Sequence, residues 1–147
     1  MKNSDLEVSK KIQIIFQSSY QVEAKILNAV DFPPLKRTLE SYIRSTNEFY
    51  GYFENHELAG IIEIERATKH IDINSLVVHP NFFRLGIGRK LVEFTFNQFD
   101  SILFIVETGA ENTPATELYK KLGFQEIKEW NTDFGVRKIR FERRMNN

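Results

Sequence analysis

The sequence of 147 residues contains no cysteine, which excludes disulfide bonds, thiolate metal sites and a cysteine nucleophile. Its three histidines, His56, His70 and His79, are scattered and lack a metal-ligand spacing such as HExxH, so no metal site is expected. No segment approaches the roughly 20 apolar residues that span a bilayer, and residues 1–17 lack the apolar core of a signal peptide. These absences predict a cytoplasmic protein with no membrane partner.

Charge of neither sign is in excess, because 20 lysines and arginines balance 20 aspartates and glutamates. This neutrality gives no support for attraction of nucleic acid or a membrane to the whole surface, so an anion site must be local. Apolar residues are plentiful: they make up 41% of the chain and include 13 phenylalanines. A chain of this length and composition is expected to form one domain, residues 1–147, with a sizeable core.

The spacing of apolar residues divides the chain into helical and extended segments. One helical segment, "TPATELYKKLGF", also has a candidate N-cap at Thr113 and a glycine, Gly123, that can end a helix. Helices are expected over 6–28, 35–46, 86–99 and 113–123, and strands over 70–78, 102–107, 124–130, 136–144 and, as a pair joined at "ENHE", 49–66. The order, ααβββαβαββ, predicts an α/β fold with a mixed central β-sheet flanked by helices.

The stretch "NFFRLGIGRKLVEF", residues 81–94, follows the strand that ends at Val78 and opens the next helix near Gly86. The first amides of a helix lack internal partners and favour an anion, and glycines leave those amides accessible. Arg84 and Arg89 could add charge-assisted hydrogen bonds. The stretch therefore indicates either a phosphate-binding loop or a glycine-containing turn that packs a helix onto the sheet.

Two common phosphate motifs do not fit this stretch. The dinucleotide fingerprint GxGxxG has Leu91 at its third glycine, and the P-loop GxxxxGK[ST] matches at none of the nearby glycines. A third pattern, a strand with a Val-x-Pro-like end, then [QR]-x-x-G-x-[GA] and a long helix, fits "LVVHPNFFRLGIGRKL". Downstream, "NTPATELYKKLGF" fits a second pattern, an Asn followed by A-x-x-L-Y-x-x-x-G-F.

With both patterns in order and a strand between them, the sequence resembles the GNAT superfamily of acyl-CoA-dependent N-acyltransferases over residues 58–126. It departs from that superfamily at Phe83, where Gln or Arg is usual, and in having no evident strand before the first helix. The loss of a polar side chain at Phe83 leaves the backbone donors of the loop intact.

The resemblance implies that acetyl-CoA binds between the strand that ends at Val78 and the strand 102–107. Pantetheine amides would pair with the backbone of Leu76 and Val78, as a peptide adds to a sheet edge, and an N–H near Val78 would face the thioester oxygen. The expected cofactor-binding residues are Leu76, Val78, Arg84, Leu85, Gly86, Ile87, Gly88, Arg89 and Asn112. Asn112 could equally be only a loop or capping residue.

Tyr119 occupies the position of the family's usual general acid, which protonates the leaving thiolate. The ordinary pKa values of a phenol and a thiol, about 10 and 8.5, are close enough for that transfer. Tyr119 also shares a helical face with Ala115, Leu118 and Leu122, so a purely structural core position is the alternative.

Glu63 is the best candidate for a catalytic carboxylate that receives the ammonium substrate and passes its proton to water. If "RATK" is a four-residue hairpin loop, Glu63 pairs with Asp72 and Glu65 with His70, while the alternate isoleucines are buried on the other face. The alternative is a solvated face without catalytic function.

The sequence thus predicts an acetyl-CoA-dependent N-acetyltransferase that acts on a primary amine by direct transfer in a ternary complex. A covalent acyl-enzyme is not expected, because the chain has no cysteine and no GxSxG motif. The alternatives are a catalytically silent acyl-CoA-binding or sensing module and a nucleotide-binding α/β domain. The neutral charge disfavours nucleic acid as a partner, and a homodimer is left open.

Overall fold

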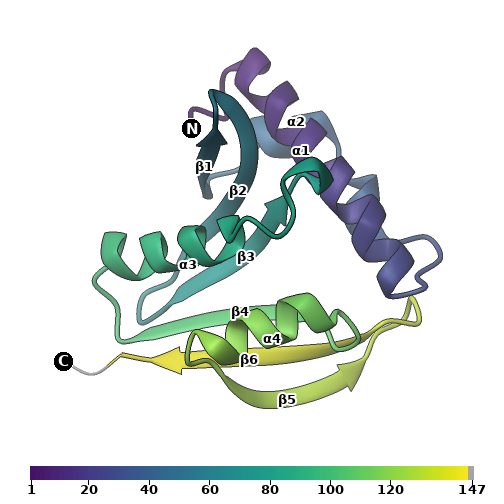
Figure 1. Ribbon diagram of the computed structural model, residues 1–147, viewed down its shortest axis with the longest axis vertical. Coiled ribbons are helices and arrows are strands. Elements are labelled where there is room, and N and C mark those ends of the chain that lie inside the picture. Colours follow the sequence, from purple (N-terminus) through teal and green to yellow (C-terminus); the bar gives the residue numbers. More distant parts are fainter. Residues whose placement is uncertain (146–147) are drawn as a thin grey trace.

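The computed structural model describes residues 1–145, and its elements follow the order ααβββαβαββ (Figure 1). This order and the mixed sheet confirm the predicted α/β fold. The helices are α1 (Leu6–Ile26), α2 (Leu39–Arg44), α3 (Ile87–Gln98) and α4 (Thr113–Lys121), with 3-10 turns η1 (Pro33–Lys36) and η2 (Pro80–Phe82). The strands are β1 (Glu48–Glu54), β2 (Glu57–Arg66), β3 (Ile71–Val78), β4 (Leu103–Gly109), β5 (Gln125–Asn131) and β6 (Arg137–Arg144).

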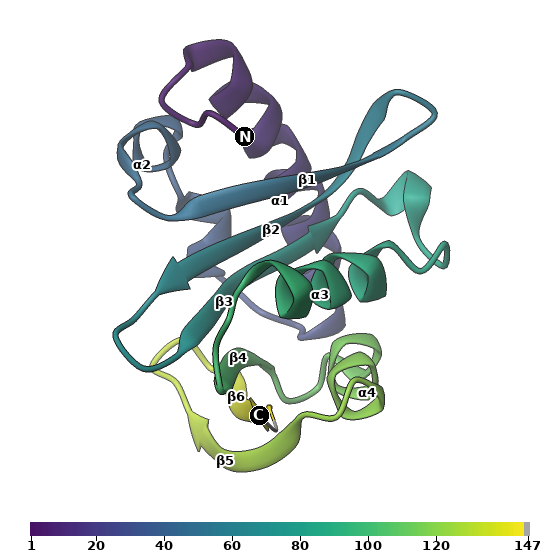
Figure 2. The same cartoon turned by 90° about the vertical axis from the view of Figure 1, so that its left-hand side faces the viewer.

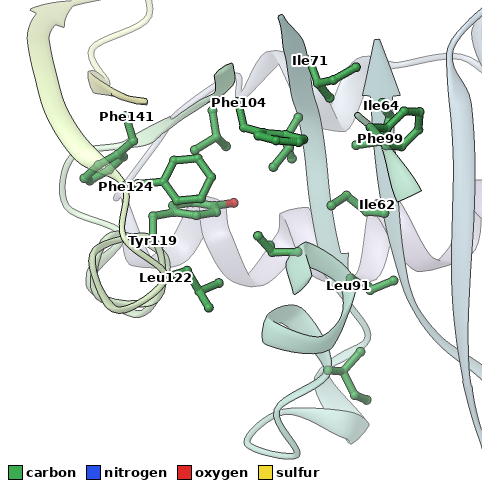
Figure 3. Packing of buried hydrophobic residues seen from close by; sticks show 14 of the residues in the cluster. Ile62, Ile64, Ile71, Leu91, Phe99, Phe104, Tyr119, Leu122, Phe124 and Phe141 are labelled. Carbon is green, nitrogen blue, oxygen red and sulfur yellow. The ribbon is translucent and has the colours of Figure 1, made fainter. Parts of the chain in front are cut away.

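The strands form a single six-stranded sheet in the order β1-β2-β3-β4-β6-β5. Helices α1 and α3 lie on opposite sides of its β1–β3 part (Figure 2). Because successive side chains of a strand point to opposite faces, Ile61 packs with Phe16 of α1 while Ile62 packs with Leu91 of α3. The second of these cores also holds the buried aromatic residues of α4 and its neighbouring strands (Figure 3).

Strands β3 and β4 form the one parallel pair of the sheet, and they pair over a short length. Only residues 71–73 pair with residues 104–106, after which the two strands diverge (Figure 1). On their other edges both strands stay paired: β3 pairs with β2 as far as Val78, and β4 pairs with β6 as far as Gly109. The sheet therefore has a V-shaped opening between the carboxyl ends of β3 and β4.

The helix boundaries depart from the prediction at two places. The helix expected over 35–46 is wrong in its first turn, because residues 33–36 form η1 and the Thr38 hydroxyl accepts the Ser41 N–H at 3.2 Å to start α2. The N-cap of α4 is Asn112 rather than Thr113, since the Asn112 side chain accepts the Ala115 N–H. Gly123 has a φ of 88°, as expected for the residue after that helix.

Among residues 1–145, no helix is both long enough and apolar enough to cross a membrane.

Candidate active site

A cavity of about 160 Å³ lies at the opening between β3 and β4. Tyr20 and Glu23 of α1 and Leu27, the residue that follows α1, line it together with Ala115 and Tyr119 of α4. Because these helices come from opposite sides of the sheet, the cavity reaches both faces through the gap between the strands. Its other lining residues are Phe32, Pro34, Ile73, Asn74, Ser75, Leu76, Val106, Glu107, Thr108, Gly109, Asn112, Phe134, Val136 and Lys138.

The edge of β3 that faces the gap offers unpaired backbone groups. The His79 N–H donates to the Ala59 carbonyl at 2.8 Å, which places residue 79 among those whose backbone groups point toward β2. In an antiparallel pair this orientation alternates, so the backbone groups of Leu76 and Val78 point the other way. There β4 has diverged, and a strand-like ligand can hydrogen-bond to these two residues.

The loop between β3 and α3 leaves the start of α3 open. Gly86 is the N-cap with a φ of 75°, and within the described chain no side chain caps the first turn. A Cβ built at Gly86 would meet nothing within 4 Å, and Arg84 also adopts a left-handed φ of 66°. The first amides of α3 are therefore accessible to an anion, as an anion-binding helix start requires.

The six expected loop residues differ in their surroundings. Ile87 is buried in the core, and Gly88 lets α3 approach α4, since a Cβ there would lie 3.3 Å from a methyl carbon of Leu118. Leu85 is exposed, as is Arg84. Arg89 is exposed too, and its guanidinium already bonds the Glu93 carboxylate at 2.9 Å.

Phe83, which stands at the usual Gln or Arg position, is 43% exposed and packs into none of the three apolar clusters of the described chain. Core packing of the Phe83 ring therefore does not determine the conformation of the loop backbone.

Tyr119 is a core residue, which is the structural alternative that the sequence left open, and its role as a general acid stays a prediction. Its ring packs in the core, with centroids 5.4 Å from Phe124 and 5.8 Å from Phe141. Its hydroxyl oxygen points away from α4 (Figure 3), and the residue lines the cavity. Burial, reinforced by the Glu23 carboxylate and Tyr20, raises the pKa of the Tyr119 phenol, so this group carries a proton at neutral pH and gives it up less readily than the ordinary phenol considered from the sequence.

Asn112 likewise caps α4 and lines the cavity. The capping alternative is confirmed by the 3.4 Å contact between its side-chain oxygen and the Ala115 N–H. Its role toward a cofactor stays a prediction.

Glu63 is buried, and both oxygens of its carboxylate accept hydrogen bonds. The Arg37 guanidinium binds its two oxygens at 2.8 and 3.0 Å, the Asn47 amide donates at 2.9 Å, and the Ser75 hydroxyl donates at 2.9 Å. Burial alone raises the pKa of this carboxyl, but the hydrogen bonds and the Arg37 charge outweigh it and the pKa is lowered. A low pKa and four occupied acceptor positions disfavour Glu63 as the group that takes a proton directly, and they suit a positioning role.

The predicted pairing around Glu63 was wrong. Glu63 lies opposite Ser75 rather than Asp72, and Glu65 lies opposite Asp72 rather than His70. Two differences cause this: Arg66 pairs with Ile71, so that the hairpin loop is residues 67–70 rather than 66–69, and a bulge at Asn74 adds one residue to β3 between the partners of Glu63 and Ile64. The buried side of the prediction was right, since Ile62, Ile64, Ile71 and Ile73 all lie in one core.

Tyr20 and Glu23 are among the polar cavity residues that sequence reasoning missed. The Tyr20 hydroxyl lies 3.0 Å from Ser75 Oγ, and Glu23 follows Tyr20 by three residues on α1. Burial raises the pKa of the Glu23 carboxyl, an effect that the neighbouring Asn112 side chain and Lys138 charge oppose in part. Local sequence gives no signal for either residue, because a polar side chain on a long amphipathic helix is ordinarily solvated.

Two solved structures with this fold carry the name N-acetyltransferase. The ribosomal-protein-S18-alanine N-acetyltransferase from Escherichia coli superposes with a TM-score of 0.75 at 19% identity, over 95% of this chain and 90% of that one. The PaiA N-acetyltransferase from Thermoplasma acidophilum, solved in complex with coenzyme A, superposes with a TM-score of 0.74 at 17% identity, over 96% and 95%. This chain therefore shares its fold with these two proteins.

Sequence comparison identifies the family itself. Residues 11–124 match the model of the acetyltransferase (GNAT) family, and this chain belongs to that family. The UPF0157 protein YqkA of Bacillus subtilis (strain 168) is 32% identical over 129 residues, which cover 87% of this chain and 38% of that protein. An N-alpha-acetyltransferase of Sulfurisphaera tokodaii is 31% identical over 70 residues, or 45% of this chain and 42% of that protein. The matches thus span about two fifths of the length of these curated relatives.

Proposed function

We propose that the protein transfers an acetyl group from acetyl-CoA to a primary amine by direct attack within a ternary complex. The observation that carries this proposal is the cavity between β3 and β4, which Tyr119 of α4 lines together with residues of α1 from the other side of the sheet. A site open to both faces of the sheet lets donor and acceptor meet without a covalent enzyme intermediate.

The donor would lie along the open edge of β3. Its diphosphate would accept hydrogen bonds from the amides of residues 85–89, with Arg84 and Arg89 adding charge. Its pantetheine amides would pair with the backbone of Leu76 and Val78, and Asn112 would contact the donor from the start of α4. The coenzyme A complex of the Thermoplasma acidophilum protein, whose fold is the same, supports this choice of ligand.

The chemistry needs a neutral amine, a stabilised oxyanion and a protonated leaving group. The amine nitrogen attacks the thioester carbonyl, and the oxygen becomes an oxyanion that the Val78 N–H can stabilise. When the C–S bond breaks, the thiolate takes the Tyr119 proton, and the extra proton on the new amide nitrogen returns to the Tyr119 oxygen. The products are the N-acetyl amine and free CoA. Glu63, the carboxylate predicted to receive the substrate proton, contributes in this scheme by positioning Ser75.

A ligand-binding test separates the proposed function from its alternatives. Saturation at about 100 times Kd stabilises a protein by about 2.7 kcal/mol, which for a chain of this size raises Tm by roughly 5–10 °C. We expect acetyl-CoA and CoA to give such a shift and thiol release to follow with some members of a panel of amines. Donor binding without thiol release across the panel would favour a silent acyl-CoA-binding module. Stabilisation by ATP or NAD but not by acetyl-CoA would overturn the proposal.

A matched pair of substitutions at Gly86 tests the anion site at the start of α3. Asn and Asp both tolerate the left-handed φ of Gly86 and project into open space, so Gly86→Asn and Gly86→Asp differ by one negative charge. Repulsion of about 1.4 kcal/mol between that charge and the diphosphate should raise the acetyl-CoA Kd of Gly86→Asp about tenfold above that of Gly86→Asn. Equal Kd values by calorimetry would place the diphosphate elsewhere.

A further inference from the structure

The α1 side of the cavity presents two oxygen-bearing side chains, Tyr20 and Glu23, which no part of the donor scheme uses. They lie three residues apart on α1 and therefore on the same face of that helix. Both line the same cavity as Tyr119, which comes from the other side of the sheet. An acceptor that reaches the thioester from the α1 side would contact these two residues first.

The hydrogen bonds behind Tyr20 fix the direction of its hydroxyl. A carboxylate only accepts hydrogen bonds, so Ser75 must donate its proton to Glu63 across their 2.9 Å contact. Ser75 Oγ is then the acceptor in its 3.0 Å contact with Tyr20, and the Tyr20 hydroxyl is the donor. With its proton committed to Ser75, the Tyr20 oxygen has only lone pairs to offer the cavity. The Glu63 cluster, which consists of Glu63 with Arg37, Asn47 and Ser75, thus makes the Tyr20 oxygen an acceptor for N–H donors.

Glu23 meets charged and titratable groups from several elements. Tyr20 belongs to its own helix, Tyr119 comes from α4, and Lys138 of β6 and Glu107 of β4 line the same cavity. Lys138 Nζ lies 3.8 Å from a carboxylate oxygen of Glu107. The positive charge of Lys138 is therefore not available to Glu23 alone. Burial dominates this environment and raises the pKa of Glu23 toward the range in which a carboxylate accepts a proton from a substrate.

We propose that Tyr20 and Glu23 form the receptor for the acceptor amine, and that Glu23 is the base that removes the ammonium proton before attack. This inference rests on the proposed acetyl transfer. The Tyr20 oxygen and the Glu23 carboxylate accept N–H bonds from the bound ammonium group. One proton then passes from nitrogen to the Glu23 carboxylate, leaving a neutral amine whose lone pair faces the thioester carbon and a neutral carboxyl group that later releases the proton to water.

Carboxyl NMR tests this receptor without knowledge of the natural acceptor. The protein is labelled with [5-¹³C]glutamate, the Glu23 signal is assigned with Glu23→Gln, and n-butylammonium chloride is titrated in. We expect the Glu23 signal to titrate above the ordinary glutamate pKa of about 4.3 and to shift saturably with n-butylammonium. The exposed Glu65 should not respond, n-butanol should have no effect, and Tyr20→Phe should weaken the n-butylammonium response. A Glu23 signal that ignores n-butylammonium, or that n-butanol moves equally, overturns the proposal.

Kinetics provides an independent test with an amine that supports thiol release. Glu23→Gln should lower kcat/KM about 10²-fold near neutral pH and abolish the acid limb of the pH profile, with the acetyl-CoA Kd unchanged. Glu7→Gln, at an exposed position on the same helix, should match the wild type. If the wild type releases thiol and Glu23→Gln keeps both rate and pH profile, the receptor is wrong and acetyl transfer stands. If the wild type binds no acetyl-CoA, acetyl transfer is wrong. The response of the Glu23 NMR signal to n-butylammonium then decides by itself whether Tyr20 and Glu23 bind an amine.

Discussion

Replacement of Tyr119 by phenylalanine is expected to slow thiol release from acetyl-CoA by about 10²–10⁴-fold while leaving the acetyl-CoA Kd nearly unchanged. Tyr119 lines the cavity and its hydroxyl points away from α4 (Figure 3), whereas the ring is held by Phe124 and Phe141 and keeps those contacts in the variant. Loss of the hydroxyl therefore removes a proton donor without removing core volume. Single-turnover thiol release with saturating donor, together with calorimetric binding of CoA, measures the two effects separately.

Tyr50→Phe is the matched control for that experiment. The Tyr50 hydroxyl bonds the Glu48 carboxylate at 2.8 Å and lies outside the cavity, so the variant loses one phenolic oxygen at a position remote from the reacting atoms. We expect its rate of thiol release to stay within a factor of two or so of the wild type. Unchanged turnover in Tyr119→Phe would leave Tyr119 with the core role alone. An equal loss in both variants would point to a general effect on folding, which the unfolding transition of each would reveal.

The parts of the site that consecutive residues build were predictable from sequence. The loop and helix of residues 81–94 and the helix of residues 112–124 each combine a short motif with a local backbone requirement. Gly86 and Gly123 both have a left-handed φ, which glycine adopts without strain. The resemblance carried by these two segments therefore identified the family, as the match over residues 11–124 shows.

The parts of the site that the sequence did not predict depend on contacts between residues far apart in the chain. The hairpin loop over residues 67–70 and the bulge at Asn74 together shift the partner of Glu63 from Asp72 to Ser75, and the bulge brings the Ser75 hydroxyl, rather than Asn74, opposite the carboxylate. No alternation of apolar residues encodes a single extra residue in one strand. Arg37 reaches Glu63 from a segment that was predicted as helix, and Tyr20 reaches Ser75 across 55 positions of the chain. These polar contacts follow from the packing of α1 and η1 on the sheet.

The Glu63 cluster gives the largest expected effect on stability. Glu63→Gln keeps the shape of the side chain but leaves the Arg37 guanidinium, which is largely buried, without its counter-charge. Breaking a buried ion pair from one side costs about 3–5 kcal/mol, and we expect a loss of that size in the free energy of unfolding measured with urea. Glu65→Gln, on the same strand but exposed, should stay within about 0.5 kcal/mol of the wild type. A loss below about 1 kcal/mol in Glu63→Gln would contradict a stabilising ion pair between Arg37 and Glu63.

The pH dependence of stability tests the same cluster in the unchanged protein. Because folding lowers the pKa of Glu63, its contribution is fully present above the unfolded-state pKa of about 4.3 and is lost as the pH falls through the folded value. The wild type should therefore lose stability more steeply than Glu63→Gln below about pH 4, and the difference between their unfolding free energies should narrow there. Parallel curves down to pH 3 would contradict a lowered pKa. Since Glu63 also orients Tyr20 through Ser75, Glu63→Gln should in addition weaken the n-butylammonium response of Glu23 at neutral pH, where the variant is still folded.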